Sequence, residues 1–285
     1  MRFHRNELLA DGVFLQTAYK SSFFGSESAT QLVMNYFLRN CVLRYGNRLS
    51  DVYIHQKKRR VVKILKIFDC GLLELEAMLA AQTPVVYAYA SVTYLQTKLL
   101  LVAMEHAGKS MLNLAGALTD QILLHVSLSV AEKVNLVHDA GFLHYDISLE
   151  NLLYRPKDKK VTLIDFGLAS HFCDTPFVPR YCGKKVYMAP EQVHIKYRSA
   201  ECTPQAIDIY ALGVVFYALV TGNFPHDGVH CSDYLRLAET DSWMTSVPPA
   251  SHLQTKIIHL AQNMCHPLCK KRPSLQSVIL ELQSF

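Results

Sequence analysis

The feature that most constrains this chain is a set of polar residues at fixed spacing in its second half. His144 and Asp146 are followed by Asn151, and an Asp-Phe-Gly triplet at 165–167 begins fourteen residues beyond that asparagine. A His-x-Asp or an Asp-Phe-Gly alone arises by chance often enough to mean little. Together, in this order and at this spacing, the motifs leave little room for an accidental origin. They therefore limit the fold more tightly than the composition does.

Size and composition set wider limits. The chain has 285 residues, half of them apolar, which suits one large domain or two small lobes. It contains no stretch of about 18 uncharged apolar residues, so no membrane span is expected. The net charge of +5 is too mild to argue for a nucleic-acid partner, and the oligomeric state cannot be read from the sequence. The first residues lack the apolar core of a signal peptide, which favours the cytoplasm; secretion stays open for a chain whose leader was removed.

Eight cysteines are distributed along the chain, and none forms a CxxC pair. Near the C-terminus, Cys265, Cys269, His259 and His266 offer zinc-ligand types at a loose spacing. The simpler interpretation is that these cysteines are thiols of the core or of helix ends in a reducing compartment. A disulfide is the alternative for a secreted chain.

The hydrophobic periodicity divides the chain into a small strand-rich part and a larger helical part. A short helix is expected before residue 40, and the basic run at 56–60 is expected to be a solvated hairpin tip. No internal repeat is visible. The predicted elements are strands within 43–70, a helix at 71–82, two strands within 85–104, helices from about 110, and short strands near 151–155 and 161–165.

The loop at 144–151 and the following Asp-Phe-Gly resemble the catalytic loop and metal-binding motif of eukaryotic protein kinases. The resemblance continues in Ala-Pro-Glu at 189–191, in Asp208, which in the family bonds the catalytic-loop backbone, and in Arg272, which matches the arginine that pairs with the glutamate of Ala-Pro-Glu. It implies an α+β, bilobal fold with a small β-rich N-lobe and a larger helical C-lobe. The implied divisions are an N-terminal extension at 1–40 and a kinase domain at 41–285, with an N-lobe of about 41–104 and a C-lobe of about 109–285.

The resemblance also implies roles for three C-lobe residues. Asp146 would accept or orient the proton of the substrate hydroxyl, and Asn151 and Asp165 would hold Mg²⁺, or Mn²⁺, against the phosphates of ATP. Phosphoryl transfer needs little covalent help from the protein, so a positioned metal ion and a positioned hydroxyl are its main requirements.

In the N-lobe, the resemblance implies a lysine that contacts the α- and β-phosphates and a glutamate that pairs with it. Lys63 is the candidate, with a surface lysine as the alternative; its rival Lys66 leaves too few residues before the next helix. Glu74 is preferred to Glu76, because Met78 then falls one turn on, where the family places an apolar residue. The residues expected around the nucleotide are Val52, Val61, Met104, Glu105, Ala107 and Leu153.

Two departures from the family pattern make the chain resemble divergent members, similar to protist kinases. The three glycine positions of the phosphate loop carry Tyr45, Asn47 and Ser50, which predicts a weaker phosphate clamp. Tyr145 replaces the arginine that reads a phosphate on the activation loop. The sequence therefore predicts an activity that is independent of phosphorylation in that loop.

A third departure is an exchange of residue types. Ser148 stands where serine/threonine kinases carry a lysine, and Lys184 stands where they carry threonine or serine. We expect Lys184 to reach back and restore the positive charge beside Asp146, with Ser148 as its hydroxyl partner. The alternative is a solvated Lys184 and an impaired enzyme.

The implied function is a protein kinase that acts on serine or threonine, since Glu150 and Ser148 occupy positions where tyrosine kinases usually carry arginine. The Ala-Pro-Glu segment and Arg272 favour a protein substrate over a small molecule. A pseudokinase that acts as a scaffold or an allosteric regulator is the alternative. The lost glycines and lysine support that alternative, whereas the intact base and metal ligands oppose it.

Overall fold

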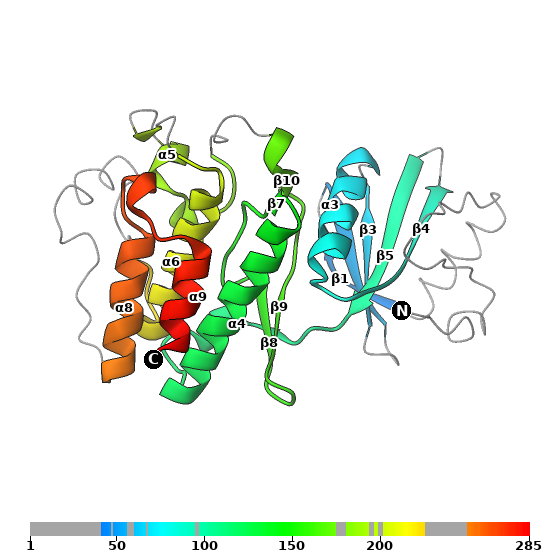
Figure 1. The fold of residues 1–285 in the computed structure, drawn as a ribbon. Coiled ribbons are helices and arrows are strands. Elements are labelled where there is room, and N and C mark those ends of the chain that lie inside the picture. Colours follow the sequence, from blue (N-terminus) through cyan, green and yellow to red (C-terminus); the bar gives the residue numbers. More distant parts are fainter. Residues whose placement is uncertain are drawn as a thin grey trace. The chain divides into compact units, whose positions relative to one another are not determined.

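The computed structural model describes residues 41–46, 48–55, 60–66, 68–94, 97–174, 181–193, 197–198, 202–225 and 250–285. Contacts divide the chain into two compact units, with the boundary between His106 and Ala107 (Figure 1). The helix expected before residue 40 and most of the expected basic tip, residues 56–59, lie outside the described residues.

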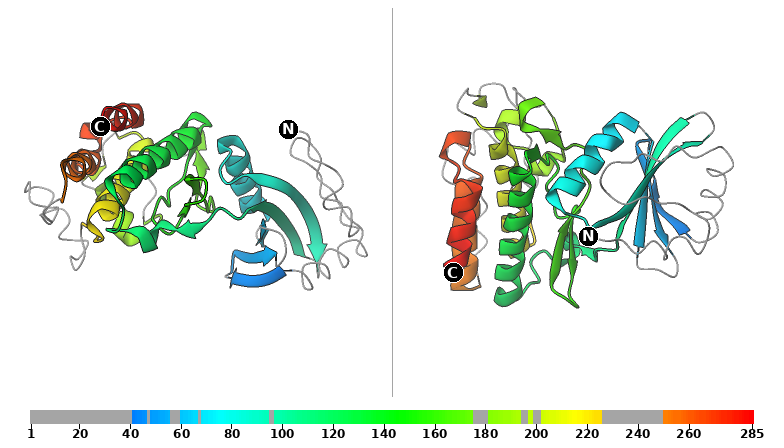
Figure 2. Two further views of the ribbon diagram at one scale, coloured as in Figure 1. Left: turned by 90° about the horizontal axis from the view of Figure 1, so that it is seen from below. Right: turned by 45° about the vertical axis from the view of Figure 1, so that its right-hand side comes forward.

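The first unit is built on a five-stranded antiparallel sheet with the strand order β1-β2-β3-β5-β4, seen from two further sides in Figure 2. Helix α3 (Phe68–Ala81) contacts β5. Ile64, Leu101 and Ala103 belong to the apolar core of this sheet. The strands are β1 (Cys41–Gly46), β2 (Ser50–His55), β3 (Arg60–Leu65), β4 (Val86–Tyr94) and β5 (Thr97–Glu105).

The predicted helix at 71–82 is confirmed as α3, and the two strands within 85–104 are confirmed as β4 and β5. The extension of strand structure to residue 70 is wrong, because β3 ends at Leu65 and α3 begins at Phe68. The backbone nitrogen of Lys66 donates to the carbonyl of Leu49 at 2.8 Å, next to the Ser50–Leu65 pair, and the apolar sequence pattern continues into the helix from Phe68.

The second unit is mainly helical and is organised around α6 (Gln205–Thr221). Every residue from Ala206 to Leu219 is buried, so α6 has no face toward solvent. At Gly213, a Cβ atom would lie 2.6 Å from Cys265 Sγ, so glycine permits the close packing of α6 against the end of α8. Helix α6 ends at Gly222, whose φ of 75° is readily reached by glycine.

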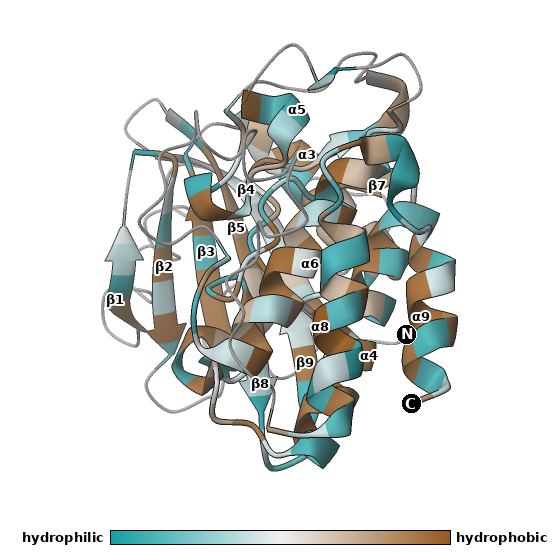
Figure 3. Cartoon of the chain, turned by 90° about the vertical axis from the view of Figure 1, so that its left-hand side faces the viewer, coloured by the Kyte–Doolittle hydropathy of each residue, from teal (hydrophilic) through white to brown (hydrophobic). Residues whose placement is uncertain are grey.

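Around α6 lie α4 (Asp120–Asp139) and α8 (His252–Met264), and α9 (Leu275–Gln283) contacts α4. The alternation of polar and apolar residues along α8 and α9 can be followed in Figure 3. No helix of the described residues is both long and apolar enough to span a bilayer. The smaller elements are β6 (Lys109–Ser110), η1 (Met111–Leu114), β7 (Phe142–Leu143), β8 (Leu152–Arg155), β9 (Lys160–Leu163), β10 (Ser170–His171), η2 (Phe172–Asp174), η3 (Lys185–Tyr187), α5 (Pro190–Val193) and η5 (Cys269–Lys271).

Cys202 and Cys269 form a disulfide that joins the segment before α6 to η5. The interpretation of Cys269 as a free thiol or a loose zinc ligand is therefore wrong. Cys265, four residues earlier, is a buried free thiol whose Sγ contacts the carbonyl of Tyr210 at 3.4 Å. Among the described residues, no group of three His, Cys, Asp or Glu side chains is arranged to hold a metal ion.

Replacing Cys202 by serine is expected to lower the free energy of unfolding by about 2–4 kcal/mol under oxidising conditions, because the bond closes a loop of 67 residues in the unfolded chain. Urea unfolding measures the loss. Cys173→Ser, which changes an exposed cysteine outside the disulfide, is the matched control and should unfold like the wild type. Equal stability of the wild type and Cys202→Ser without reductant would contradict the prediction.

Candidate functional site

Asp208, on α6, holds the backbone of the loop at 144–151. Its Oδ2 accepts from the backbone nitrogen of His144 at 2.8 Å, and its Oδ1 accepts from that of Tyr145 at 2.9 Å. On the other side, His138 Nε2 lies 3.0 Å from Asp208 Oδ2. Asp208 therefore bonds the catalytic-loop backbone as the sequence predicted, and it does so from the most deeply buried helix.

The charge of Asp208 is maintained in this buried place. Burial raises the pKa of the carboxyl, but the hydrogen bond and charge of His138 and the backbone donor of His144 outweigh that effect and hold the pKa below its usual range. Burial lowers the pKa of His144 despite the neighbouring carboxylates. A neutral His144 then accepts from the backbone nitrogen of Asp146 through Nδ1 and donates to the carbonyl of Ile164 through Nε2, each at 3.2 Å.

Asp146 is fixed by Asn151. The amide nitrogen of Asn151 donates to the Asp146 carbonyl at 2.8 Å and to Asp146 Oδ2 at 2.7 Å. The other oxygen of Asp146, Oδ1, is buried and accepts no hydrogen bond from the described residues. The side chain retains partial exposure, 14%. The carboxylate is thus oriented and partly open.

The β8–β9 hairpin brings Asn151 and Asp165 to one end of the sheet. Asn151 precedes β8 and Asp165 follows β9, with Leu152 opposite Leu163. The backbone nitrogen of Ile164 donates to the carbonyl of Asn151 at 2.9 Å, which ties the two ends together. Asp165 is exposed with a φ of 65°, whereas the next residue, Phe166, is buried and packs edge-on against His144 with ring centroids 4.7 Å apart.

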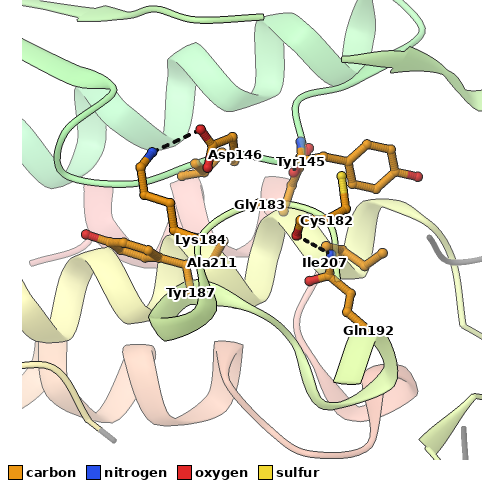
Figure 4. A pocket seen from close by; sticks show the side chains of 11 residues that line it. Tyr145, Asp146, Cys182, Gly183, Lys184, Tyr187, Gln192, Ile207 and Ala211 are labelled. Atoms are coloured by element: carbon orange, nitrogen blue, oxygen red, sulfur yellow. Dashed lines mark hydrogen bonds and ion pairs between the residues drawn. The ribbon is translucent and has the colours of Figure 1, made fainter. Parts of the chain in front are cut away.

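Lys184 lies beside Asp146. Its Nζ donates to Asp146 Oδ2 at 2.9 Å and to Ser148 Oγ at 2.8 Å. The lysine side chain is 35% exposed, and Ser148 is fully buried. Figure 4 shows the Lys184 side chain extending toward Asp146 at the edge of a small pocket. The structure therefore brings the two exchanged residues, Lys184 and Ser148, together with Asp146.

Hydrogen bonds hold the segment around Lys184 to the catalytic loop and to itself. The Tyr187 hydroxyl accepts from the backbone nitrogen of Leu149 and donates to Glu150 Oε2, each at 3.1 Å. Burial raises the pKa of Tyr187, which keeps the hydroxyl proton in place. On the other side, the buried Gln192 donates to the carbonyl of Cys182 at 2.9 Å (Figure 4). No sequence motif indicated a role for Gln192.

Tyr145, at the position of the missing arginine, is buried with a φ of 61°. It belongs to an apolar cluster with Leu143 and Ile207, against which Phe172 and Cys182 pack. An aromatic ring thus lies beside the activation segment, which is the stretch between Asp165 and Glu191. The family places at this position an arginine that binds a phosphate on the activation loop. The predicted independence of phosphorylation agrees with this replacement and stays a prediction.

Glu191 and Arg272 form a bidentate ion pair, with Nη1–Oε1 at 2.6 Å and Nη2–Oε2 at 2.8 Å. Both side chains are fully buried. The Arg272 Nη1 also donates to the carbonyl of Ala206 at 2.8 Å, and Nε donates to that of His266 at 2.9 Å. Arginine is required here, because its planar fork meets a carboxylate and two carbonyls at once.

In the first unit, Lys63 Nζ donates to Glu74 Oε1 at 2.6 Å, and both residues are buried. The rival residues lie elsewhere: Lys66 pairs with Asp51 at 2.8 Å, and Glu76 is exposed. The structure therefore pairs the preferred lysine with the preferred glutamate. The Lys66–Asp51 pair, which joins the end of β3 to β2, was not predicted.

The remaining predicted residues keep to regular positions within their own units. In the first unit, Val52 pairs with Lys63, and Val61 pairs with Met104 on β5. The side chain of Glu105 is buried and accepts from the backbone nitrogen of Val85 at 3.2 Å. In the second unit, Ala107 is buried before β6, and Leu153 on β8 lies opposite Ser110 and Thr162. Of the former glycine positions, Tyr45 is exposed, Ser50 is buried and Asn47 lies outside the described residues.

Comparison with known families agrees with this geometry. The family model of the protein kinase domain matches residues 46–282. NUAK family SNF1-like kinase 1 of Mus musculus is 27% identical over 216 residues, which are 73% of this chain and 32% of that protein. The probable serine/threonine-protein kinase MARK-A of Dictyostelium discoideum is 29% identical over 136 residues, 46% of this chain and 12% of that protein. The chain thus spans a third or less of the length of these relatives.

A solved structure shares the fold. The kinase PK-1 of Cydia pomonella granulovirus superposes with a TM-score of 0.66 over 88% of this chain and 97% of its own, at 20% sequence identity. At that identity the likeness extends to the fold alone, an α+β arrangement with a β-sheet N-lobe and a helical C-lobe.

Proposed function

The chain belongs to the protein kinase family, and from that premise we propose that it transfers the γ-phosphoryl group of ATP to a hydroxyl group of a protein, with serine or threonine as the acceptor. The observation that carries the proposal is the oriented carboxylate of Asp146, held by Asn151 and adjacent to Lys184. A carboxylate so placed can accept the proton of an attacking hydroxyl.

The residues at the end of the β8–β9 hairpin fit a divalent metal ion. The amide nitrogen of Asn151 is committed to Asp146, so the amide oxygen remains as a ligand. Asp165 is exposed at the same end of the hairpin. Carboxylate and amide oxygens are hard ligands that Mg²⁺ or Mn²⁺ accepts, with water and phosphate oxygens completing the coordination. When bound, the ion would neutralise phosphate charge.

ATP binding in the first unit rests on the Lys63–Glu74 pair. The glutamate holds the lysine ammonium in a buried site, from which it would reach the α- and β-phosphates. Across the sheet, Val52 pairs with Lys63, and Val61 pairs with Met104. The apolar surface for the base would be formed by Val52, Val61 and Met104. The proposal adds the backbones of Glu105 and Ala107 as hydrogen-bonding groups and Leu153 as an apolar contact.

A protein substrate is favoured by the Glu191–Arg272 pair, which fixes the segment that follows Tyr187. Lys184, which precedes Tyr187 in the same stretch of chain, lies beside Asp146, so a peptide whose hydroxyl reaches Asp146 would lie along residues 184–191. The choice of serine or threonine rests on residues 148 and 150, which lack the arginine of tyrosine kinases.

A scaffold without phosphotransfer is the second candidate, and the phosphate-loop positions favour it. Tyr45 and Ser50 carry side chains where glycines would let backbone amides approach a phosphate. The buried Lys63–Glu74 pair and the ordered Asp146 favour the enzyme instead.

Phosphotransfer from labelled ATP with Mg²⁺ or Mn²⁺ to peptides whose only hydroxyl is serine, threonine or tyrosine tests the proposal. We expect transfer to serine and threonine, lost to background in Asp146→Asn and in Asp165→Asn. Asp158→Asn, which changes an aspartate of the same unit whose side chain is 48% exposed, should keep the wild-type rate. If the wild type shows neither phosphotransfer nor a shift of its melting temperature with Mg²⁺ and ATP, the proposal of a scaffold replaces that of an enzyme.

A further inference from the structure

We propose that the cation that stabilises the transferring phosphoryl group is Lys184 of the activation segment, and not a residue of the catalytic loop. This inference deepens the proposed function and rests on it. Residues 144–151 contain neither lysine nor arginine, and burial keeps His144 neutral. The catalytic loop therefore brings no positive charge of its own to Asp146.

The hydrogen bonds of Lys184 leave it a free donor. A lysine ammonium carries three N–H groups. One points to Asp146 Oδ2 and one to Ser148 Oγ, and no third acceptor occurs among the described residues. With a side chain that is 35% exposed, the third N–H can meet a phosphate oxygen beside Asp146.

Ser148 fixes the direction of the lysine. Its side chain is fully buried, and its Oγ accepts from Lys184 at 2.8 Å. A lysine at 148 would have to extend from that buried place to the same carboxylate, whereas a serine there fills little space and offers an acceptor. The serine and the lysine are thus hydrogen-bonded to each other, and the positive charge comes from the activation segment instead of the catalytic loop.

The backbone around Lys184 is held close to the catalytic loop. Gly183 has a φ of 89°, and a Cβ atom there would lie 2.5 Å from the carbonyl of Tyr145, so only glycine permits this approach. Lys184 then precedes η3, whose Tyr187 is bonded to Leu149. Attachment on both sides limits how far the ammonium can move from Asp146.

The chemical step follows from this placement. The substrate hydroxyl oxygen forms a bond to the γ-phosphorus of ATP as the bond from that phosphorus to the β–γ bridging oxygen breaks, and ADP leaves with the bond's electron pair. The hydroxyl proton passes to the carboxylate of Asp146. Lys184 donates to a non-bridging oxygen of the phosphoryl group during transfer, where charge is spread over these oxygens.

The test compares single and exchanged variants in the phosphotransfer assay. Lys184→Ala should lower kcat by about 10²–10³-fold, as for the loss of one charge-stabilising donor, with the KM for ATP changed less than about threefold. Lys185→Ala, the exposed neighbour, is the matched control and should keep the wild-type kcat. The double variant Ser148→Lys/Lys184→Thr, which restores the usual arrangement, should recover at least about tenfold over Lys184→Ala.

A second readout needs no turnover. Mg²⁺, ADP and aluminium fluoride mimic the transferring phosphoryl group, so they should raise the melting temperature of the wild type more than Mg²⁺ and ADP do. Lys184→Ala should lose this additional shift and keep the shift with ADP. A Lys184→Ala kcat within threefold of wild type, or an unchanged additional shift, would overturn the inference while leaving the kinase function intact. An inactive wild type would overturn both the inference and the kinase function. Asp165→Asn gives the background of the assay, since it abolishes any true phosphotransfer.

Discussion

Replacement of Arg272 by alanine is expected to lower the free energy of unfolding by about 3–5 kcal/mol, because it leaves the carboxylate of Glu191 buried without its counter-charge. It also removes the donor to the Ala206 carbonyl, at the first residues of α6. Urea unfolding measures the loss, and Lys271→Ala, which changes the exposed preceding residue, is the control.

Two further variants show that the loss comes from the unpaired charge. Arg272→Lys keeps a positive charge but gives up the bidentate geometry, so its stability should fall between those of the wild type and Arg272→Ala. The double variant Glu191→Leu/Arg272→Met removes both charges and should be more stable than Arg272→Ala. A loss below about 1 kcal/mol in Arg272→Ala would mean that the pair is worth no more than a surface pair.

Asp208→Ala is expected to lower the free energy of unfolding by about 3–6 kcal/mol and to abolish phosphotransfer. The change removes the acceptor of two backbone N–H groups, at His144 and Tyr145, and the partner of His138, all inside the protein. Asp146, the next residue, loses the backbone support that places it. Glu132→Gln, an exposed change on the helix that carries His138, should alter neither quantity.

The pH dependence gives an independent check on Asp208. Because its pKa is held below the usual range in the folded chain, its ionised form contributes stability that is fully present above the unfolded value of about 3.9 and is lost as the pH falls further. The buried, neutral His144 adds a loss that begins below about pH 6.5. Asp208→Asn should remove the part of the stability loss that occurs below about pH 4. The same acid slope in Asp208→Asn and the wild type would contradict the assignment.

The sequence predicted those parts of the molecule that depend on spacing. Asp146, Asn151 and Asp165 are set by a loop and a short hairpin, whose register follows from local pairing. Lys63 was preferred to Lys66 by counting residues to the next helix, and the structure pairs it with Glu74. Strand structure predicted to residue 70 was wrong, because an apolar pattern continues from β3 into α3, which begins at Phe68.

Contacts between distant residues that belong to no recognised motif gave no signal in the sequence. The Cys202–Cys269 disulfide spans 67 residues and has no local motif. Gln192 and the apolar surroundings of Tyr145 depend on how the activation segment folds back, which periodicity does not encode. Lys184 differs from these, because its exchange with Ser148 pairs two distant positions by the charge that the chemistry requires. The Glu191–Arg272 pair was likewise predicted, from the family resemblance.

The burial of α6 from Ala206 to Leu219 has a consequence for how the chain is made. As the polypeptide leaves the ribosome from its N-terminus, α6 emerges before α8 and α9, and its apolar residues lie on every side. Until α8 is synthesised, the apolar residues of α6 that will pack against it stay exposed on the nascent chain. A nonsense mutation between the end of α6 and residue 250 would make that state permanent, and its product should aggregate or be captured by chaperones instead of persisting as a soluble fragment.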